Sequence, residues 1–335
     1  MPRVREIEVF RLVLPYARRP ESILVRLVDY GGMDGWGEVV DADPKVWAAL
    51  EEGLARALIG VDWEHPDELG VVPGGSAADM ACWDLWTKMR GVPLSHALGG
   101  NRTSLIATAR IGGDRNLESL VARVNRLVCA GYAHVTLDVH PDWDIEPLRA
   151  VRHAYPALGI GVDARGVYTD IDALEALDAY NLSSIERPFA SLADHADLQE
   201  RVAAPVLLDV SSVTELDEAI KASAGRALLL RPAALGSLRE VRRAHDHAVA
   251  AGWEIACAGG QGTGLARAAT VAAASLPGCD LPCDVAEPPR SAQIVTPPVG
   301  ASGGVVAVPL TQSGLGHTID EVRVRRLAKE SYTTR

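Results

Sequence analysis

Lysine is scarce in this chain of 335 residues, although lysine and arginine together number 33. It occurs only at Lys45, Lys88, Lys221 and Lys329. No lysine lies between Lys88 and Lys221, which excludes a lysine base from that whole stretch. Arginine carries the basic charge there, and it stays protonated at neutral pH.

Cysteine, long apolar runs and excess positive charge are also missing. The five cysteines show no CxxC spacing, which predicts reduced thiols in a cytoplasmic protein. No apolar run approaches the roughly 20 residues that span a bilayer, and the alternating start MPRVREIEVF predicts a strand instead of a signal peptide. A net charge of −11 argues against nucleic acid and anionic membrane surfaces as partners.

The first 100 residues have the pattern of a small α+β domain. Strands are expected at 4–14, 22–29 and 35–39, with helices at 43–58 and 76–90. Ser76 is the expected N-cap of the second helix. Gly99 and Gly100 end this part, so we expect residues 1–100 to form a capping domain, with a tail at about 304–335 packing back on it.

From about residue 104, short apolar runs alternate with amphipathic helical segments. The expected strands are 105–111, 134–139, 160–163, 182–186, 206–209, 227–231, 254–257 and 281–285, and the expected helices are 115–130, 144–155, 170–179, 191–202, 213–222, 236–251 and 263–275. This alternation predicts an α/β fold, a TIM-type (β/α)7–8 barrel over residues 101–303. An open doubly wound sheet is the alternative, but no GxGxxG follows a strand.

Three consecutive expected strands end in an acid. Asp163, Glu186 and Asp209 follow one another at equal spacing, since 186 − 163 and 209 − 186 are both 23. In a parallel barrel the carboxyl ends of the strands share one face, where barrel active sites lie. Carboxylate oxygens converging there suit Mg²⁺ or a similar hard cation.

The motifs GWGEV (35–39), DMACWDLWTKMRGVPLSHALGG (79–100), VDARGVYT (162–169) and SSIERP (183–188) make the chain resemble the enolase superfamily. The resemblance is to its muconate-lactonising subgroup, and within it most closely to the o-succinylbenzoate synthase/N-acylamino-acid racemase family. It implies Mg²⁺ held by Asp163, Glu186 and Asp209, with proton abstraction next to the carboxylate of a small-molecule substrate. It also implies a homo-oligomer.

The sequence departs from that family at the positions expected to do the chemistry. Thr136 and Asp138 stand where the family has Lys-x-Lys, and Arg231 stands in place of the opposite lysine. Arg165 and Arg187 replace an expected Asn and Gln beside the metal ligands. These changes make an ordinary o-succinylbenzoate synthase an unlikely interpretation.

Asp138 and His140 are the remaining candidates for a catalytic base. Asp138 is placed to point inward beside the ligands, and histidine titrates near neutral pH. Arg231 is a poor base but can bind a carboxylate or stabilise an oxyanion. Thr136, Arg165 and Arg187 are the predicted substrate-binding residues.

Two pairs of alternatives stay open at this point. Arg165 and Arg187 either leave Mg²⁺ in place or neutralise the carboxylates and replace the metal. The protein is either a divergent lyase or isomerase with a base other than lysine, or a catalytically inactive or repurposed binding protein on the same scaffold.

Overall fold

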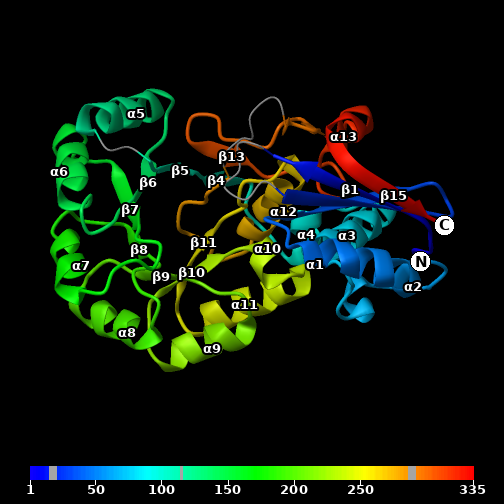
Figure 1. The fold of residues 1–335 in the computed structure, drawn as a ribbon, viewed down its shortest axis with the longest axis horizontal. Coiled ribbons are helices and arrows are strands. Elements are labelled where there is room, and N and C mark those ends of the chain that lie inside the picture. The colour runs from blue at the N-terminus through cyan, green and yellow to red at the C-terminus, as the bar shows by residue number, and fades with distance from the viewer. Residues whose placement is uncertain (15–20, 114–115, 286–291) are drawn as a thin grey trace.

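The computed structural model of the chain describes residues 1–14, 21–113, 116–285 and 292–335. It divides into an antiparallel sheet with its helices and a curled parallel sheet ringed by helices (Figure 1). Among the described residues, no helix combines the length and apolar character needed to cross a membrane.

The antiparallel sheet joins the two ends of the chain. Its strand order is β15-β1-β2-β3. The bounds are β1 Val4–Val13, β2 Glu21–Asp29, β3 Asp34–Val40 and β15 Ala328–Thr334. The first three strands confirm the predicted strands, and the last comes from the charged C-terminal tail, which pairs with β1. Both termini therefore lie at the same end of the molecule (Figure 1).

Helix α3, Ser76–Arg90, packs on β3 with little space between the two backbones. A Cβ on Gly37 would lie 2.0 Å from the Ala77 carbonyl oxygen, and a Cβ on Gly35 would lie 2.2 Å from that of Ala81. Glycine at both positions of the GWGEV motif is therefore required for this close approach. The predicted helix over 76–90 is confirmed.

The expected N-cap at Ser76 is wrong. Gly75, with φ +59°, is the N-cap residue, and the Ser76 hydroxyl donates to the Glu38 carbonyl oxygen at 3.5 Å. A backbone turn that needs positive φ takes the place of a side-chain cap here. The predicted helix over 43–58 forms as three joined pieces. They are α1 Pro44–Ala49, η1 Leu50–Leu54 and α2 Ala55–Leu58, and they are followed by η2 Pro66–Leu69 and α4 Leu94–Leu98.

The parallel sheet has seven strands in the order β11-β10-β9-β8-β7-β6-β5. Their bounds are β5 Thr108–Ile111, β6 His134–Asp138, β7 Gly159–Asp163, β8 Ser184–Glu186, β9 Val206–Asp209, β10 Ala227–Leu230 and β11 Glu254–Cys257. All seven were predicted. The first expected strand, 105–111, is split, since β4 Ser104–Ile106 pairs instead with β13 Val305–Ala307 of the tail.

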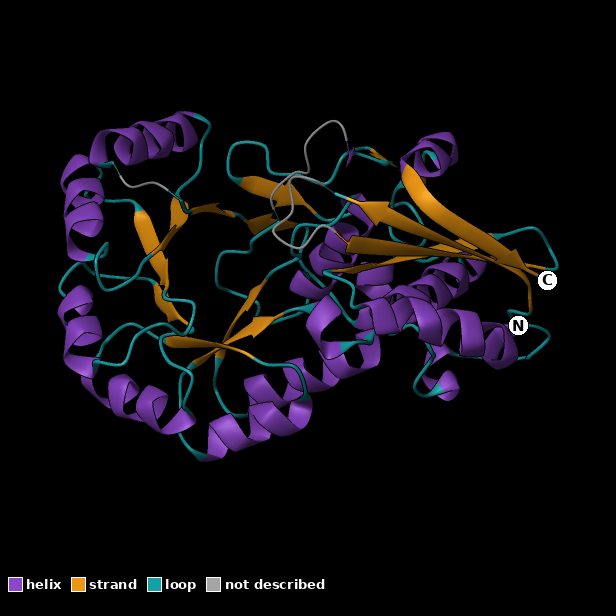
Figure 2. Ribbon diagram, in the orientation of Figure 1, coloured by secondary structure: helices purple, strands orange, loops and turns teal. Residues whose placement is uncertain are grey.

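Helices cover the outer face of this sheet, in the order in which they follow the strands (Figure 2). Their bounds are α5 Leu117–Cys129, α6 Ile145–Ala154, α7 Ile171–Asp178, α8 Leu192–Arg201, α9 Val213–Lys221, α10 Pro232–Leu235, α11 Leu238–Ala250 and α12 Gly264–Ala274. The tail adds β12 Val295–Thr296, β14 Thr318–Ile319 and α13 Glu321–Leu327. Aliphatic side chains between strands and helices form the larger of two main cores, and the other lies under the antiparallel sheet.

The segment expected as an eighth strand bridges the two edges of the parallel sheet. Cys283 donates its N–H to Ile106 and accepts from Thr108 at the β5 edge. Asp284 donates to Cys257 at 2.8 Å and accepts from Gly259 at 3.1 Å at the β11 edge. The described part of this segment makes isolated bridges instead of a regular strand. It brings Asp284 into the same ring as the ends of the strands.

Glu38 joins the two sheets. Its buried carboxylate accepts from the Ser22 hydroxyl at 2.7 Å in the antiparallel sheet. The same carboxylate accepts from the Thr263 N–H, the Thr263 hydroxyl and the Ala266 N–H at the start of α12, at 2.7, 2.8 and 2.9 Å. An anion at a helix N-terminus is favoured by the unpaired N–H groups and the helix dipole.

Replacing Glu38 with alanine is expected to lower the free energy of unfolding by about 3 kcal/mol or more, because several buried donors lose their acceptor. Urea denaturation followed by circular dichroism measures this change. The control is Glu52→Ala, since Glu52 is exposed and its loss should change stability by less than about 0.5 kcal/mol. Equal effects of the two substitutions would contradict this account of Glu38.

Asp79 makes a second link, from α3 to α11. Its carboxylate is buried and accepts from the Leu238 N–H at 2.7 Å. Burial raises the pKa of Asp79 to about 7; the hydrogen bond from Leu238 acts against this shift, and the nearby Asp67 adds to it. The folded state therefore holds a proton on Asp79 that the unfolded state releases near its ordinary pKa of 3.8.

Because that pKa is raised, the contribution of Asp79 to stability is full at low pH and is lost as the pH rises toward about 7. Asp79→Asn keeps an acceptor for Leu238 and removes the titration. We expect the Tm of the variant minus the Tm of the wild type to be larger at pH 8 than at pH 4.5. Thermal denaturation at both pH values measures this difference. A difference in Tm that does not change with pH would refute this assignment.

Candidate active site at the strand ends

Neighbouring parallel strands place their terminal acids side by side. Asp138 pairs in register with Asp163, and Asp163 pairs with Glu186. Asp209 ends the next strand, β9. Asp163 and Glu186 are almost fully buried, at 1% and 2% exposure. Buried carboxylates must be paired or neutralised, because their desolvation is costly.

Arg110, on the edge strand β5, supplies much of that neutralisation. Its guanidinium donates to Asp163 at 2.9 Å, to Glu186 at 2.5 Å and to Asp284 at 2.7 Å. Burial opposes its charge, but the carboxylates of Glu186, Asp284 and Asp163 outweigh burial and raise the pKa of Arg110. The guanidinium is therefore a permanent cation among three acids.

Three further arginines complete the network. Arg187 donates to Asp163 and lies 3.2 Å from Glu186 and 3.7 Å from Asp209. Arg231 holds Asp209 with two nitrogens, Nε at 2.8 Å and one Nη at 2.7 Å. Arg165 pairs with Asp138. Five carboxylates and four guanidinium groups thus leave this cluster with a formal charge of about −1.

Arg165 and Arg187 reach these acids from strained backbone. Their φ values are +53° and +48°, in the left-handed region that non-glycine residues rarely adopt. The Arg165 N–H donates to Asp163 Oδ1 at 3.0 Å, and the Arg187 N–H donates to the Leu207 carbonyl at 3.1 Å. Strain held by such contacts is typical of functional sites.

Burial changes the acidity of two of the carboxyl groups. It raises the pKa of Glu186 to about 7, with Arg110 and Arg187 acting in the opposite direction and Asp163 adding to the rise. Burial also raises the pKa of Asp138, opposed mainly by the charge of Arg165. Asp138 is therefore a stronger base than an exposed aspartate would be.

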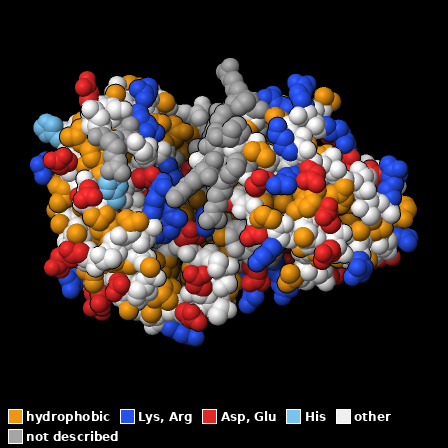
Figure 3. Space-filling view, in the orientation of Figure 1, with side chains coloured by type: hydrophobic (Ala, Val, Ile, Leu, Met, Phe, Trp, Pro, Cys, Tyr) orange, Lys and Arg blue, Asp and Glu red, His pale blue; other side chains and the backbone are white. Residues whose placement is uncertain are grey.

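Several cavities formed by the described residues lie beside the network. One of about 560 Å³ is lined by Arg187 and Arg231, by Val40 and Asp41 after β3, and by the loop around Gly260. It lies between the antiparallel sheet and the strand ends. Figure 3 shows Lys and Arg side chains, with acidic ones among them, around the central hollow on this face.

A second cavity, of about 260 Å³, holds the two predicted bases. Asp138, His140 and Arg165 line it together with Trp143. The carboxylate of Asp138 packs against Gly112. A Cβ on Gly112 would lie 1.8 Å from Asp138 Oδ2, so only glycine fits at that position. His140 belongs to a turn in which the Trp143 N–H donates to the His140 carbonyl at 2.7 Å. His140 and Asp138 thus line one cavity, and Arg231 lines the larger one.

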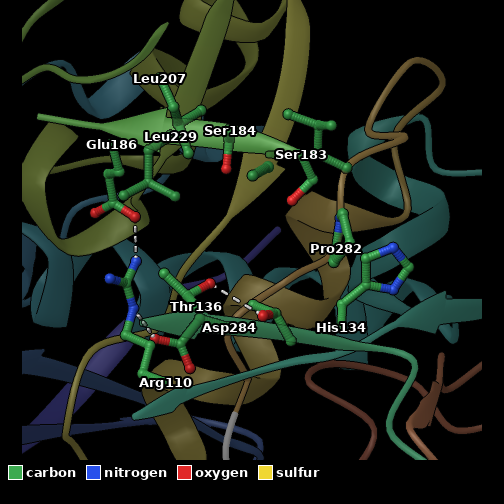
Figure 4. A pocket seen from close by; sticks show the side chains of 13 residues that line it. Arg110, His134, Thr136, Ser183, Ser184, Glu186, Leu207, Leu229, Pro282 and Asp284 are labelled. Carbon is green, nitrogen blue, oxygen red and sulfur yellow. Dashed lines mark hydrogen bonds and ion pairs between the residues drawn. The ribbon is translucent and has the colours of Figure 1, made fainter. Parts of the chain in front are cut away.

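Thr136 lies two residues before Asp138 on β6. Its hydroxyl is buried and hydrogen-bonds with that of Thr108 at 3.0 Å. Thr108, Thr136 and Arg110 line a small cavity of about 30 Å³, which Figure 4 shows from close by. That volume suits one or two water molecules.

Arg110 and Asp284 were not predicted from the sequence. Arg110 stands two residues after Thr108 in an expected strand, and such alternate positions share one face. Asp284 ends the last apolar run, LPCDV, just as the other acids end theirs. The signal for Asp284 was therefore the strand-end pattern already used for Asp163, Glu186 and Asp209.

Mg²⁺ does not fit this arrangement of side chains. Guanidinium nitrogens hold the carboxylate oxygens that a cation would need, and no cluster of three or more His, Cys, Asp or Glu within the described ranges is arranged to hold a metal ion. A divalent ion about 4 Å from one guanidinium would be repelled by roughly 8 kcal/mol at an effective dielectric constant of about 20. The residues present favour arginine pairing.

We therefore expect 5 mM MgCl₂ and 5 mM EDTA to leave the Tm of the wild-type protein unchanged, within about 1 °C. A bound ion would stabilise the folded state by mass action and raise Tm as its concentration increased. Differential scanning fluorimetry measures both conditions, with KCl at matched ionic strength as the control. A concentration-dependent rise with MgCl₂ alone would contradict the pairing.

The fold and the strand-end acids define an α/β protein with an antiparallel sheet, a curled parallel sheet and a polar site at the carboxyl ends of the parallel strands. The family model "Enolase C-terminal domain-like" matches residues 119–323. The chain belongs to the enolase superfamily, in its muconate-lactonising-like group.

Its relatives include named enzymes. It is 33% identical to an o-succinylbenzoate synthase of Geobacillus stearothermophilus, over 92% of this chain and 89% of that one. It is 33% identical to an N-succinylamino acid racemase of Thermus thermophilus, over 78% and 75%. A crystal structure of an enolase-superfamily member from Listeria innocua superposes with a TM-score of 0.91 at 25% identity, covering 99% of both chains.

Proposed function

We propose that this protein binds a small carboxylate at the strand-end mouth without a divalent metal, as a repurposed member of its lyase and isomerase family. The observation that carries the proposal is the neutralisation of Asp163, Glu186 and Asp209 by arginines instead of by an open coordination site. This pairing favours one of the alternatives that the sequence left open, a binding protein on the same scaffold.

Arg187 and Arg231 are the groups proposed to receive the ligand. Their side chains are 37% and 35% exposed and line the cavity of about 560 Å³. Arg231 uses Nε and one Nη on Asp209, so its other Nη is available for a second carboxylate. Charge-assisted bonds from a fixed guanidinium are among the stronger hydrogen bonds in proteins.

The chemical class of the ligand follows from the relatives. Their names refer to o-succinylbenzoate and to N-succinylamino acids, which are small carboxylates. A cavity of about 560 Å³ accommodates molecules of that size. Asp41, at the edge of the antiparallel sheet, would face the part of the ligand farthest from the arginines.

Isomerase or lyase chemistry with Asp138 as the base is the second candidate. The raised pKa of Asp138 favours it, since burial makes this carboxylate a better proton acceptor. Arg231 would then stabilise the oxyanion, and His140 would be the alternative base. Thr136, Arg165 and Arg187 would position the substrate in this proposal. The arginine pairing leaves no step for Mg²⁺.

The proposal assumes a particular division of the chain. Residues 101–303 would form a TIM-type barrel, closed through the bridging segment around Cys283 and Asp284. Residues 1–100, with the tail from about 304, would form the capping domain above its mouth. A homo-oligomer remains the expected assembly.

The test is calorimetric titration of the metal-free protein, in EDTA, with o-succinylbenzoate and a series of N-succinylamino acids. We expect at least one ligand to bind, and Arg231→Met to weaken that binding by roughly 10- to 100-fold through the loss of a charge-assisted contact. Arg201→Met is the matched control, because Arg201 pairs with Asp172 on an outer helix.

Absence of binding to every carboxylate, or equal affinity in the two variants, would overturn the proposal. Incubation of the protein with the same ligands in D₂O tests the second candidate, isomerase or lyase chemistry, separately from binding. Deuterium incorporation next to the carboxylate that disappears in Asp138→Asn or His140→Ala would establish catalysis by that residue. Binding of a ligand without deuterium incorporation supports the binding protein.

A further inference from the structure

We infer that the guanidinium of Arg110 is a built-in cation that takes the place of the divalent metal and keeps a latent cation site closed. This inference rests on the metal independence in the proposed function but does not require a carboxylate ligand. It assigns a role to a residue that lies on the first strand of the parallel sheet and outside the motifs of the predicted site.

Arg110 lies where the buried acids converge. Its three nitrogens donate to three different carboxylates, those of Asp284, Asp163 and Glu186. Figure 4 shows its guanidinium between Glu186 on one side and Asp284 on the other. A metal ion bound by Asp163 and Glu186 would need the oxygens that Nη1 and Nη2 now hold.

The position of Arg110 is fixed more firmly than that of the other arginines. It lies within β5, where it pairs in register with Thr136 of β6. Its side chain is 26% exposed, against 37% for Arg187 and 42% for Arg165. Arg165 and Arg187 follow the ends of β7 and β8, so their side chains can turn toward solvent more readily.

Asp284 is the third carboxylate that the guanidinium of Arg110 contacts. With Arg110 present, Asp284 accepts from Nε at 2.7 Å and balances part of the guanidinium charge. Its backbone also joins β11 through the N–H bond to Cys257 at 2.8 Å. Arg110 and Asp284, together called the insert, thus tie the bridging segment to the strand-end acids.

Removing that insert would leave carboxylates suited to a hard cation. Asp163 and Glu186 would lose the guanidinium that competes for their oxygens, while Asp209, which ends the next strand, would stay paired with Arg231. Carboxylate oxygens and water are the ligands that Mg²⁺ and Mn²⁺ prefer. Arg187 would remain nearby, with a side chain that is 37% exposed.

The test is Mn²⁺ binding, measured by the electron paramagnetic resonance signal of free Mn²⁺. Arg110→Met removes the cation, and the charge-balanced Arg110→Met/Asp284→Asn removes the whole insert and leaves the net charge unchanged. We expect at least a 10-fold tighter Kd for Mn²⁺ in these variants than in the wild type, with a Tm that rises as Mn²⁺ is added.

Arg201→Met is the matched control, because it removes an arginine outside the network that pairs with Asp172 and Glu175. We expect it to bind Mn²⁺ no better than the wild type. Tight binding by the wild type, an equal gain in Arg201→Met, or a folded double variant without any gain would each overturn the inference. If Arg110→Met alone does not fold, the double variant decides the question.

The two proposals can fail separately. A gain of Mn²⁺ binding in the Arg110 variants, with no carboxylate bound by the wild type, would remove the proposed ligand and leave the built-in cation in place. Carboxylate binding by the wild type, with no Mn²⁺ gain in a folded double variant, would do the reverse.

Discussion

Neutralisation of buried carboxylates at the ends of parallel strands is the constraint on which this site depends. Register places Asp138, Asp163 and Glu186 side by side, and the fold buries two of them almost completely. Ionised carboxylates in such a place require a compensating cation. Guanidinium groups meet that requirement here with fixed positions and several donors each.

Neutralisation by guanidinium groups instead of a metal changes the chemistry available at the strand ends. A metal offers vacant coordination positions to a substrate and stabilises negative charge on it. A guanidinium bound to several carboxylates offers only its remaining N–H groups, and it does not lose its proton at neutral pH. In the proposed function these remaining N–H groups receive the anion, while burial raises the pKa of Asp138.

The antiparallel sheet contributes to the site through its anchoring. Glu38 binds the start of α12, and Asp79 binds the start of α11, so two buried acids hold the two parts of the molecule together. Val40 and Asp41 follow directly after Glu38 and line the larger cavity. The position of this wall is thus set by the same hydrogen bonds that stabilise the contact between the sheets.

The sequence by itself determined the order of strands and helices, the acids that end the strands and the loss of every lysine near them. Periodicity and strand ends are local properties, which is why these predictions agree with the structure. Only the tertiary structure decided which charges meet. Arg110, Asp163, Glu186 and Asp284 are separated by up to 174 residues and converge because the curled sheet and its bridging segment bring their strand ends together.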